Sequence, residues 1–360
     1  MRFMFRDAVS FDQDIGDWNT QNVNDMRQMF EKAKSFNQDI GEGETDNVTD
    51  MSSMFSGAES FDKYIGGWDT GSVSDMRFMF YEAESFNQDI GDWDTRNVTL
   101  MSNMFREAES FDQDIGDWEV GNVENMARMF EGAKAFNQDI GGWHVGNVEN
   151  MVSMFNGAEA FDQDLSDWNV SSVVDNSFFD NTMEEMFDDS GLSTENYDAL
   201  LIGWEALDLQ EDITLGAQGI QYSNAAADAR QSIIDTYNWT INDDGAVPAF
   251  KLAANGVTVV CEDADVGDSG EVEGTEYTKR TADEITPENA ATTCTSGITG
   301  MSELFRDEAS FDEDISTWDV SSVGSMSSMF SGADSFNQDI GAWDVAKLST
   351  AYGPDGLTAS

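Results

Sequence analysis

The chain has 360 residues, of which 71 are acidic and only 17 are Lys or Arg, giving a formal net charge of −54 at pH 7. A surface this negative repels nucleic-acid phosphates and anionic membranes, which excludes the usual electrostatic routes to either partner. Because 24 Phe, 19 Met and 10 Trp recur at fixed spacings, we expect an ordered protein rather than an acidic disordered chain.

Segments that would direct the chain to or through a membrane are not evident. No run of 18 apolar residues occurs, so we expect neither a transmembrane helix nor direct membrane insertion. The first residues, MRFMFRDAVSF, lack the apolar core of a signal peptide. Only two cysteines are present, which is too few for a disulfide-based scaffold.

A 25-residue unit recurs along the chain, and each copy opens with a phenylalanine. These are Phe11, Phe36, Phe61, Phe86, Phe111, Phe136 and Phe161, followed after a gap by Phe311 and Phe336. A fixed period of this length is typical of a solenoid, in which consecutive units stack on one another.

With the opening Phe as position 1, the unit reads F-[ND]-Q-D-I-G-x-W-[DN]-[TV]-x-[NS]-V-x-x-M-x-x-M-F-x-x-A-x-[SA]. The I-x-x-W-x-[TV] spacing copies the core of a leucine-rich repeat, and W-x-[TV] alternates as a strand does. Positions 16, 19, 20 and 23 change to helical spacing. We predict an α/β repeat solenoid of leucine-rich-repeat-like right-handed coils, each a short strand plus a helical turn, interrupted by a small α+β capping region.

Positions 7, 9 and 11 should point outward from the predicted strands, about 4.8 Å apart in neighbouring coils. Their carboxylates would form a ladder that is screened by water and salt or bridged by Ca²⁺, which prefers several oxygen ligands. The candidate ligand face comprises Asp17, Asn19, Asp69, Asp92, Asp94, Asp117, Glu119, His144, Asp167, Asn169, Asp319 and Asp344.

The aspartates at position 4 are Asp14, Asp39, Asp89, Asp114 and Asp139. They fit turn or capping carboxylates that accept backbone N–H groups, which is the interpretation we favour. The alternative is a calcium site, although no strict EF-hand or nonapeptide calcium motif is present. No cofactor is required, and Ca²⁺ is the one candidate.

The repeats of the first block, residues 1–173, give way to a predicted helical cap at residues 174–246. A helix should begin at Ser193 or Thr194 and present Tyr197, Leu200, Leu201, Trp204 and Leu207 on one face. A second helix is predicted in NAAADARQSIIDTYNW, followed by a strand in WTI. These two helices would close the first block.

Residues 247–295 are predicted to be a β-rich linker or opening cap, with a strand in GVTVVC and a hairpin in GEVEGTEYTKR. Cys261 and Cys294 flank this region. They could form a disulfide if the protein is exported, or remain buried thiols. A second solenoid block follows at residues 296–350, and residues 351–360 form a tail.

The units FNQDIGDWDT and NVTLMSNMF of residues 86–105, with their copies, resemble the BspA-like leucine-rich-repeat surface proteins of bacteria. NYDALLIGWEALDLQ and ARQSIIDTYNWTI are similar to the segment that ends a block in that family, and residues 249–261 with 279–301 to the segment that opens another. The resemblance implies a secreted or cell-surface protein tied to adhesion or matrix binding, without shared catalytic residues. Gly43, Tyr64 and Glu308 depart from the pattern, which suggests local loosening.

The two ends of the sequence are in matching phase. Met1, Met4 and Phe5 fall at positions 16, 19 and 20, whereas Trp343 is position 8 and Thr350 is position 15. Either the chain is a fragment of a longer protein, or one molecule docks head-to-tail on the next, which produces a filament. The tail would slightly obstruct that contact.

Catalysis is not expected. The single histidine, His144, lies at a variable outward position, and no nucleophile, zinc-protease, P-loop or dinucleotide motif occurs in its required context. We predict a non-enzymatic extracellular or cell-surface repeat protein with an acidic adhesive or structural surface that can assemble head-to-tail into filaments. The alternative is a calcium-assisted adhesin module that is a monomeric fragment. The partner would be the protein itself or an extracellular-matrix or cell-surface ligand.

Overall fold

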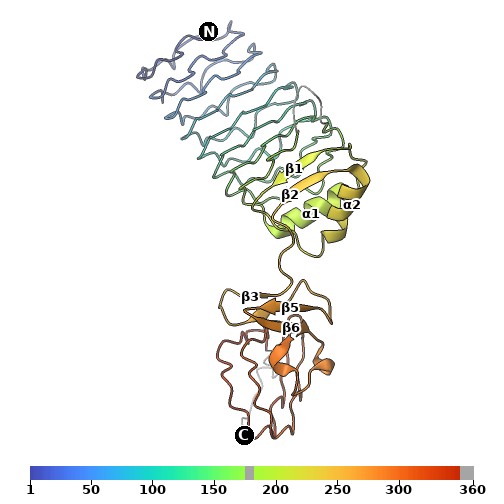
Figure 1. Cartoon of the computed structure of the whole chain (residues 1–360). Coiled ribbons are helices and arrows are strands. Elements are labelled where there is room, and N and C mark those ends of the chain that lie inside the picture. Colours follow the sequence, from blue (N-terminus) through green and yellow to red (C-terminus); the bar gives the residue numbers. More distant parts are fainter. Residues whose placement is uncertain (175–181, 349–360) are drawn as a thin grey trace, which may run out of the picture. The chain divides into compact units, whose positions relative to one another are not determined.

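The computed structural model describes residues 1–174 and 182–348. The chain divides into two compact units, Met1–Ala246 and Val247–Ser360. Figure 1 shows that the first unit consists of successive coils followed by two helices and two strands, and that the second contains small sheets followed by further coils. The predicted tail, residues 351–360, and residues 349–350 of the second block lie outside the described residues.

Neighbouring coils are joined through their backbones along positions 15–22. Met26, Gln28 and Phe30 donate their N–H groups to carbonyl oxygens of the next coil at 2.9–3.0 Å. Isolated parallel bridges at position 15 continue the series through Asp25, Asp50, Asp75, Leu100, Asn125 and Asn150. The backbone donors at alternate residues therefore point along the stack rather than around a helix.

The prediction of a strand and a helical turn in each coil is wrong in these details. Residues 1–174 contain turns and isolated bridges but no helix or longer strand. Position 18 has a positive φ, as in Gln28 at 54°, and position 22 does too, as in Lys32 at 58°. Left-handed residues interrupt an α-helix, so the helical spacing of the apolar residues reflects shared burial and not helical backbone. The handedness of the coils stays a prediction.

The core of the coils is built from ladders of like side chains. Phe80 stacks on Phe86 at 4.0 Å between ring centroids, and on Phe105 of the next coil at 5.5 Å. Trp93 and Trp118 lie parallel, with their centroids 6.3 Å apart. The ladder residues of the inner coils are essentially fully buried. Buried aromatic rings contribute large apolar areas, so this stacking is the main apolar stabilisation of the first unit.

A further coil, hidden in the sequence, precedes the cap. Met183, Met186 and Phe187 repeat the M-x-x-M-F signature, and Phe187 stacks on Phe155 at 5.6 Å. The seven extra residues before Met183, compared with the regular spacing from Met151, explain why the period search missed this coil. The signal that could have revealed it is the short motif itself.

The cap replaces one coil by a helix. Helix α1 (Thr194–Glu205) begins after Ser193, whose side chain accepts the N–H of Asn196, as the sequence predicts. Trp204 donates its indole N–H to the carbonyl of Leu165 at 3.3 Å, which is the contact that a repeat tryptophan makes. Helix α2 (Ala227–Tyr237) packs on α1, and strands β1 (Thr214–Ala217) and β2 (Thr240–Asp243) pair in parallel.

The second unit begins with small sheets. Strands β3 (Lys251–Leu252) and β4 (Val259–Val260) are antiparallel, and β5 (Ser269–Val272) with β6 (Thr275–Lys279) forms the predicted hairpin. Strand β7 (Thr293–Cys294) pairs in parallel with β6, after the short 3₁₀ helices η1 (Ala282–Glu284) and η2 (Ala290–Thr292). A buried disulfide joins Cys261 to Cys294, with their Cα atoms 6.2 Å apart.

The coils of the second unit follow the same rules. Met301 and Phe305 donate their N–H groups to the next coil at 2.8 and 2.9 Å. Trp318 and Trp343 stack with 6.2 Å between ring centroids. No helix among the described residues is long and apolar enough to cross a membrane.

A buried ion pair fastens the cap of the first unit. The carboxylate of Asp243, whose side chain is 1% exposed, accepts two hydrogen bonds from Arg230 at 2.7 and 3.0 Å. It also accepts the hydroxyl of Tyr197 at 3.0 Å and the N–H of Gly245 at 3.1 Å. Burial beside this carboxylate raises the pKa of Tyr197 well above its usual value, which keeps the hydroxyl protonated as a donor.

Arg230→Ala should destabilise the first unit by about 3–5 kcal/mol, because it leaves the Asp243 carboxylate buried without a counter-charge. Urea unfolding followed by circular dichroism measures this change in the free energy of unfolding. Arg230→Ala combined with Asp243→Asn should recover part of the loss, since the uncompensated charge is removed. An equal or larger loss in the double variant would contradict this assignment.

Candidate functional site

The predicted ligand face is mostly exposed, but its members are not equivalent. Exposed side chains are those of Asp17, Asn19, Asp69, Asp92, Asp117, Glu119, His144, Asp167, Asn169 and Asp344, whereas Asp94 is half-buried. Residues at one position lie on successive coils, as predicted. The face therefore runs along the stack and is not a single cleft.

Asp319 does not belong to this face, contrary to the prediction. It is 6% exposed and accepts the hydroxyl of Ser296 at 2.7 Å and the N–H of Ser321 at 3.0 Å. Its backbone carbonyl accepts the hydroxyl of Thr295 at 2.8 Å. The cause is local: Ser296, the first residue of the predicted second block, is itself buried and binds this carboxylate, which holds the side chain away from solvent.

At position 9, several side chains accept a backbone N–H of the turn that they belong to. Asn19 accepts the N–H of Gln21 at 3.1 Å, and Asp69 accepts that of Gly71 at 3.0 Å. Asp94 additionally binds the guanidinium of Arg96, at 2.6 Å for its closest contact, and this hydrogen bond lowers the pKa of Asp94. A short Asp or Asn side chain is suited to this turn, so position 9 combines structure with exposure.

Position 7 carboxylates have no such partner. Asp17, Asp92, Asp117 and Asp167 make no hydrogen bond or ion pair with the part of the chain that the structure describes. Asp92 and Asp117 occupy adjacent coils. These are the carboxylates of the face that are free to accept a ligand's donors or a cation.

The position 4 aspartates all close a turn. In Asp14, Asp39, Asp89, Asp114 and Asp139, one carboxylate oxygen accepts the N–H of the glycine two residues on at 3.0 Å. The glycine is required because a Cβ on Gly91 or Gly116 would lie 2.7–2.8 Å from a carbonyl of the next coil. Among the described residues, no group of three or more His, Cys, Asp or Glu is arranged to hold a metal ion.

Position 2 carries a ladder that the sequence analysis missed. Each Asp or Asn oxygen accepts the backbone N–H of position 2 in the next coil, as Asp62 does from Asn87 at 3.0 Å. Most also accept the side-chain amide of position 3, as Asp62 does from Gln88 at 2.7 Å. The residues alternate strictly: Asp12, Asn37, Asp62, Asn87, Asp112, Asn137 and Asp162.

This alternation separates the charges of the ladder. Neighbouring coils lie about 5 Å apart, where two carboxylates repel each other measurably. An amide between them accepts the same hydrogen bonds without charge. The hydrogen bond from Gln38 and the N–H of Asn37 lower the pKa of Asp12, so the ladder favours its ionised form.

Two hollows interrupt the face where glycines replace larger residues. One, of about 510 Å³, surrounds His144 and is lined by Gly121, Gly142, Gly146 and Asp167 among others. The other, of about 410 Å³, lies beside Glu42, Glu44, Asp46 and Asp69. Glycines at positions 7 and 11 of the coil of His144 remove the side chains that would fill the first hollow.

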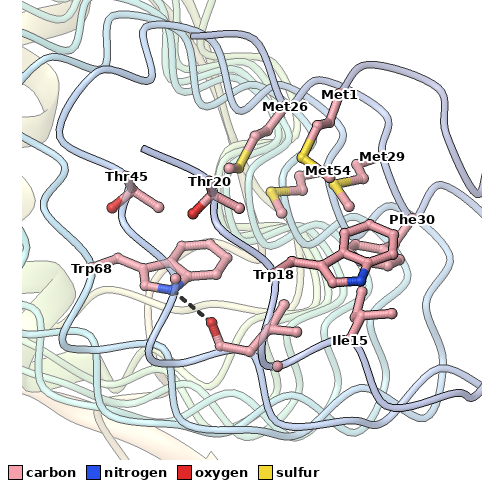
Figure 2. A pocket seen from close by; sticks show the side chains of 13 residues that line it. Met1, Ile15, Trp18, Thr20, Met26, Met29, Phe30, Thr45, Met54 and Trp68 are labelled. Atoms are coloured by element: carbon pink, nitrogen blue, oxygen red, sulfur yellow. Dashed lines mark hydrogen bonds between the residues drawn. The ribbon is translucent and has the colours of Figure 1, made fainter. Parts of the chain in front are cut away.

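A third, smaller hollow lies inside the first coils. Figure 2 shows Trp18 and Trp68 on opposite sides of it, with methionines above and Ile15 below. Its volume is about 40 Å³, and Gly43, which stands where the repeat has tryptophan, is part of its lining. The departure at Gly43 therefore leaves space in the core and not only a looser surface.

Comparison with known families places the repeats of this chain in one described family. The family described as "Mycoplasma protein of unknown function, DUF285" matches residues 1–107, 88–199 and 276–353. The chain belongs to this family. The second DUF285 match includes the hidden coil at Met183, and the third covers the coils of the second unit. No curated protein and no solved structure matches the chain.

Among the acidic positions of this DUF285 chain, the geometry separates two roles. Aspartates at positions 2, 4 and 9 accept backbone N–H groups and so stabilise turns or the contacts between coils, whereas the Glu119 carboxylate at position 9 accepts no hydrogen bond from the described residues. Those at position 7 remain unpaired on the exposed face. A positively charged or cation-bridged ligand would therefore meet the position 7 row first.

Asn87→Asp should destabilise the first unit by about 1–2 kcal/mol at neutral pH, because it places a carboxylate between Asp62 and Asp112. The loss should shrink in high salt and disappear as the pH falls below about 4, where the added group is protonated. Urea unfolding at several pH values and salt concentrations tests this.

The matched control is Asp112→Asn, which keeps the acceptor oxygen and removes a charge. It should change the free energy of unfolding by less than about 0.5 kcal/mol. Equal losses for the two variants would show that charge separation is not the reason for the alternation.

Proposed function

We propose that the chain is a non-catalytic extracellular or cell-surface repeat protein that binds a ligand on its acidic face. The supporting observation is the set of exposed position 7 carboxylates without partners among the described residues: Asp17, Asp92, Asp117 and Asp167, of which Asp92 and Asp117 lie on adjacent coils. The resemblance of the repeat to BspA-like surface proteins supports adhesion or matrix binding as the purpose. Under this proposal the coils form a leucine-rich-repeat-like solenoid that serves as a scaffold.

The contrast between positions supports binding over a purely structural role. The residues that build the stack recur almost without change, whereas position 7 is Asp, Glu, Gly, Thr or Ala and position 11 also varies. A scaffold that only needed solubility would gain nothing from this variation. The hollow around His144, next to Asp167, gives a ligand a place to enter the face.

Export to an oxidising environment is supported by the second unit. The disulfide between Cys261 and Cys294 is buried and closes a segment with a sequence separation of 33. Disulfides of this structural kind persist outside the cytosol and are rare within it. The partner would then be a matrix or cell-surface ligand, with Ca²⁺ as a possible bridge between adjacent carboxylates.

The triple variant Asp92→Asn, Asp117→Asn, Asp167→Asn should lose more than about tenfold in binding to an immobilised basement-membrane preparation, because it removes the unpaired carboxylates. Binding is measured by biolayer interferometry, with and without about 1 mM Ca²⁺, a concentration at which extracellular calcium modules respond. A loss limited to the calcium condition would favour the cation-bridged alternative.

The matched control carries the same change of charge elsewhere: Glu84→Gln, Glu124→Gln, Glu159→Gln, all at exposed positions. It should bind within about twofold of the natural chain. Equal losses in both triple variants would mean that net charge alone governs binding. No binding by the natural chain would remove the adhesive proposal for this probe.

Head-to-tail assembly remains a separate prediction. Phe3 and Met4 of the first coil are exposed, and Trp343 of the last described coil is half-buried. Electron microscopy of the purified chain should show filaments with an axial repeat near one molecule's length if these coils dock on one another. Uniform monomers with and without Ca²⁺ would contradict assembly and leave the ligand-binding proposal standing.

A further inference from the structure

We propose that the hollow at Gly43 is a binding site for an indole ring supplied by a small free molecule. The inference does not depend on the function of the acidic face. It rests on three observations: a missing tryptophan in an otherwise continuous ladder, an acceptor without its usual donor, and apolar walls that already fit an indole elsewhere in the stack.

The other coils show what this position holds. Trp93 donates its indole N–H to the carbonyl of Ile65 in the preceding coil at 3.1 Å, and Trp118 does the same to Ile90. Each such carbonyl also accepts the backbone N–H three residues later in its own coil, as Ile65 does from Trp68. The position 5 carbonyl therefore accepts two donors in a complete coil.

At the first coil, one of the two donors is missing. The carbonyl of Ile15 accepts the backbone N–H of Trp18 at 3.1 Å, but Gly43 has no indole to supply the second hydrogen bond. No other donor to this oxygen occurs among the described residues. An indole placed in the hollow would donate its N–H to Ile15, in the geometry that the chain uses in its other coils.

The walls of the hollow are those of an aromatic slot. Trp18 and Trp68 face it from the two sides, and the thioethers of Met29 and Met54 lie above it (Figure 2). Trp68 keeps its own bond to Ile40 at 3.2 Å, so that wall is fixed. Sulfur and ring contacts of this kind favour an aromatic guest over an aliphatic one.

The backbone around the hollow keeps the geometry of the repeat, although the surrounding side chains fill part of the space of the missing indole. Gly43 donates its N–H to Ile40 at 3.2 Å, and Thr20 donates its hydroxyl to the carbonyl of Glu44 at 2.8 Å, so the coil keeps the repeat geometry. The volume of about 40 Å³ exceeds the roughly 10–15 Å³ that one water needs. It is smaller than the roughly 150 Å³ apolar cavity that stays dry and binds benzene, so its walls must move apart to admit an indole.

Entry of a whole ring requires only side-chain movement. Trp18 is 37% exposed and stacks, among the described residues, only on the partly buried Phe5 at 5.8 Å, so this wall can shift outward more easily than the buried Trp68. Methionine side chains are flexible and adapt to a guest. The side chains that line the hollow are uncharged, which disfavours a charged ligand because they cannot replace its hydration.

The direct test is binding of 5-fluoroindole to the full chain, followed by ¹⁹F NMR and isothermal calorimetry. We expect one saturable site. Indene, which has the shape of indole without the N–H, should bind about fivefold more weakly, which corresponds to the loss of one hydrogen bond. Absence of saturable binding to the natural chain would overturn the proposal.

Variants locate the site. Gly43→Trp fills the slot with the chain's own indole and should abolish binding; a Cβ there would lie 3.2 Å from the Ile40 carbonyl, so only a small shift is needed. Gly43→Ala leaves the slot open and should still bind. Circular dichroism and the melting temperature confirm that both variants fold. Binding that is unchanged in Gly43→Trp would overturn the proposal.

Creating the same hollow at another coil gives an independent check. Trp118→Gly removes the indole between Trp93 and Trp143 and should add a second binding equivalent, at the cost of stability. The tripeptide Gly-Trp-Gly distinguishes the source of the ring. If it binds more tightly than 5-fluoroindole, the slot is built for the tryptophan of a protein partner, and the small-molecule form of the proposal is overturned.

Discussion

The structure depends on one constraint: each residue of a coil stacks on its own equivalent in the next coil. Apolar ladders profit from this, because parallel Phe and Trp rings are buried by their copies. The same stacking destabilises ladders of charged residues, because equivalent side chains of like charge lie about 5 Å apart in neighbouring coils and repel each other. The alternation of Asp and Asn at position 2 is the solution in this chain, since the amide accepts the same hydrogen bonds without adding charge.

The same constraint explains much of the acidic composition. Turns at positions 4, 9 and 15 each need a short side-chain oxygen that accepts the N–H two residues on, as in Asp89, Asp69 and Asp75. Asp and Asn provide this oxygen, and every additional coil repeats the requirement. Many carboxylates are therefore structural, and arginines neutralise some of them, as Arg77 does for Asp75 at 2.6 Å. The unpaired position 7 row is what remains for a ligand.

Sequence periodicity predicted which residues are buried, the start of α1 after Ser193 and the β5–β6 hairpin. It could not predict the backbone conformation. Apolar residues three or four apart indicate side chains that are buried on the same side of the chain, but not the dihedral angles of the backbone between them. The left-handed residues at positions 18 and 22 are mostly not glycine, so nothing in the composition reveals them. Asp319 was misplaced because the repeat pattern does not reveal that a buried serine of the preceding stretch, Ser296, binds its carboxylate.

In such a stack, specific recognition of a ligand requires coils that differ from their neighbours. Identical coils give identical environments, which cannot distinguish one ligand atom from another. Where glycines replace larger residues, as at Gly142 and Gly146 beside His144, the face gains a hollow. Gly43 does the same to the core, where the loss of one indole leaves both a slot and an unused acceptor at Ile15. The departures from the repeat are thus the positions where this chain can recognise something other than its own next coil.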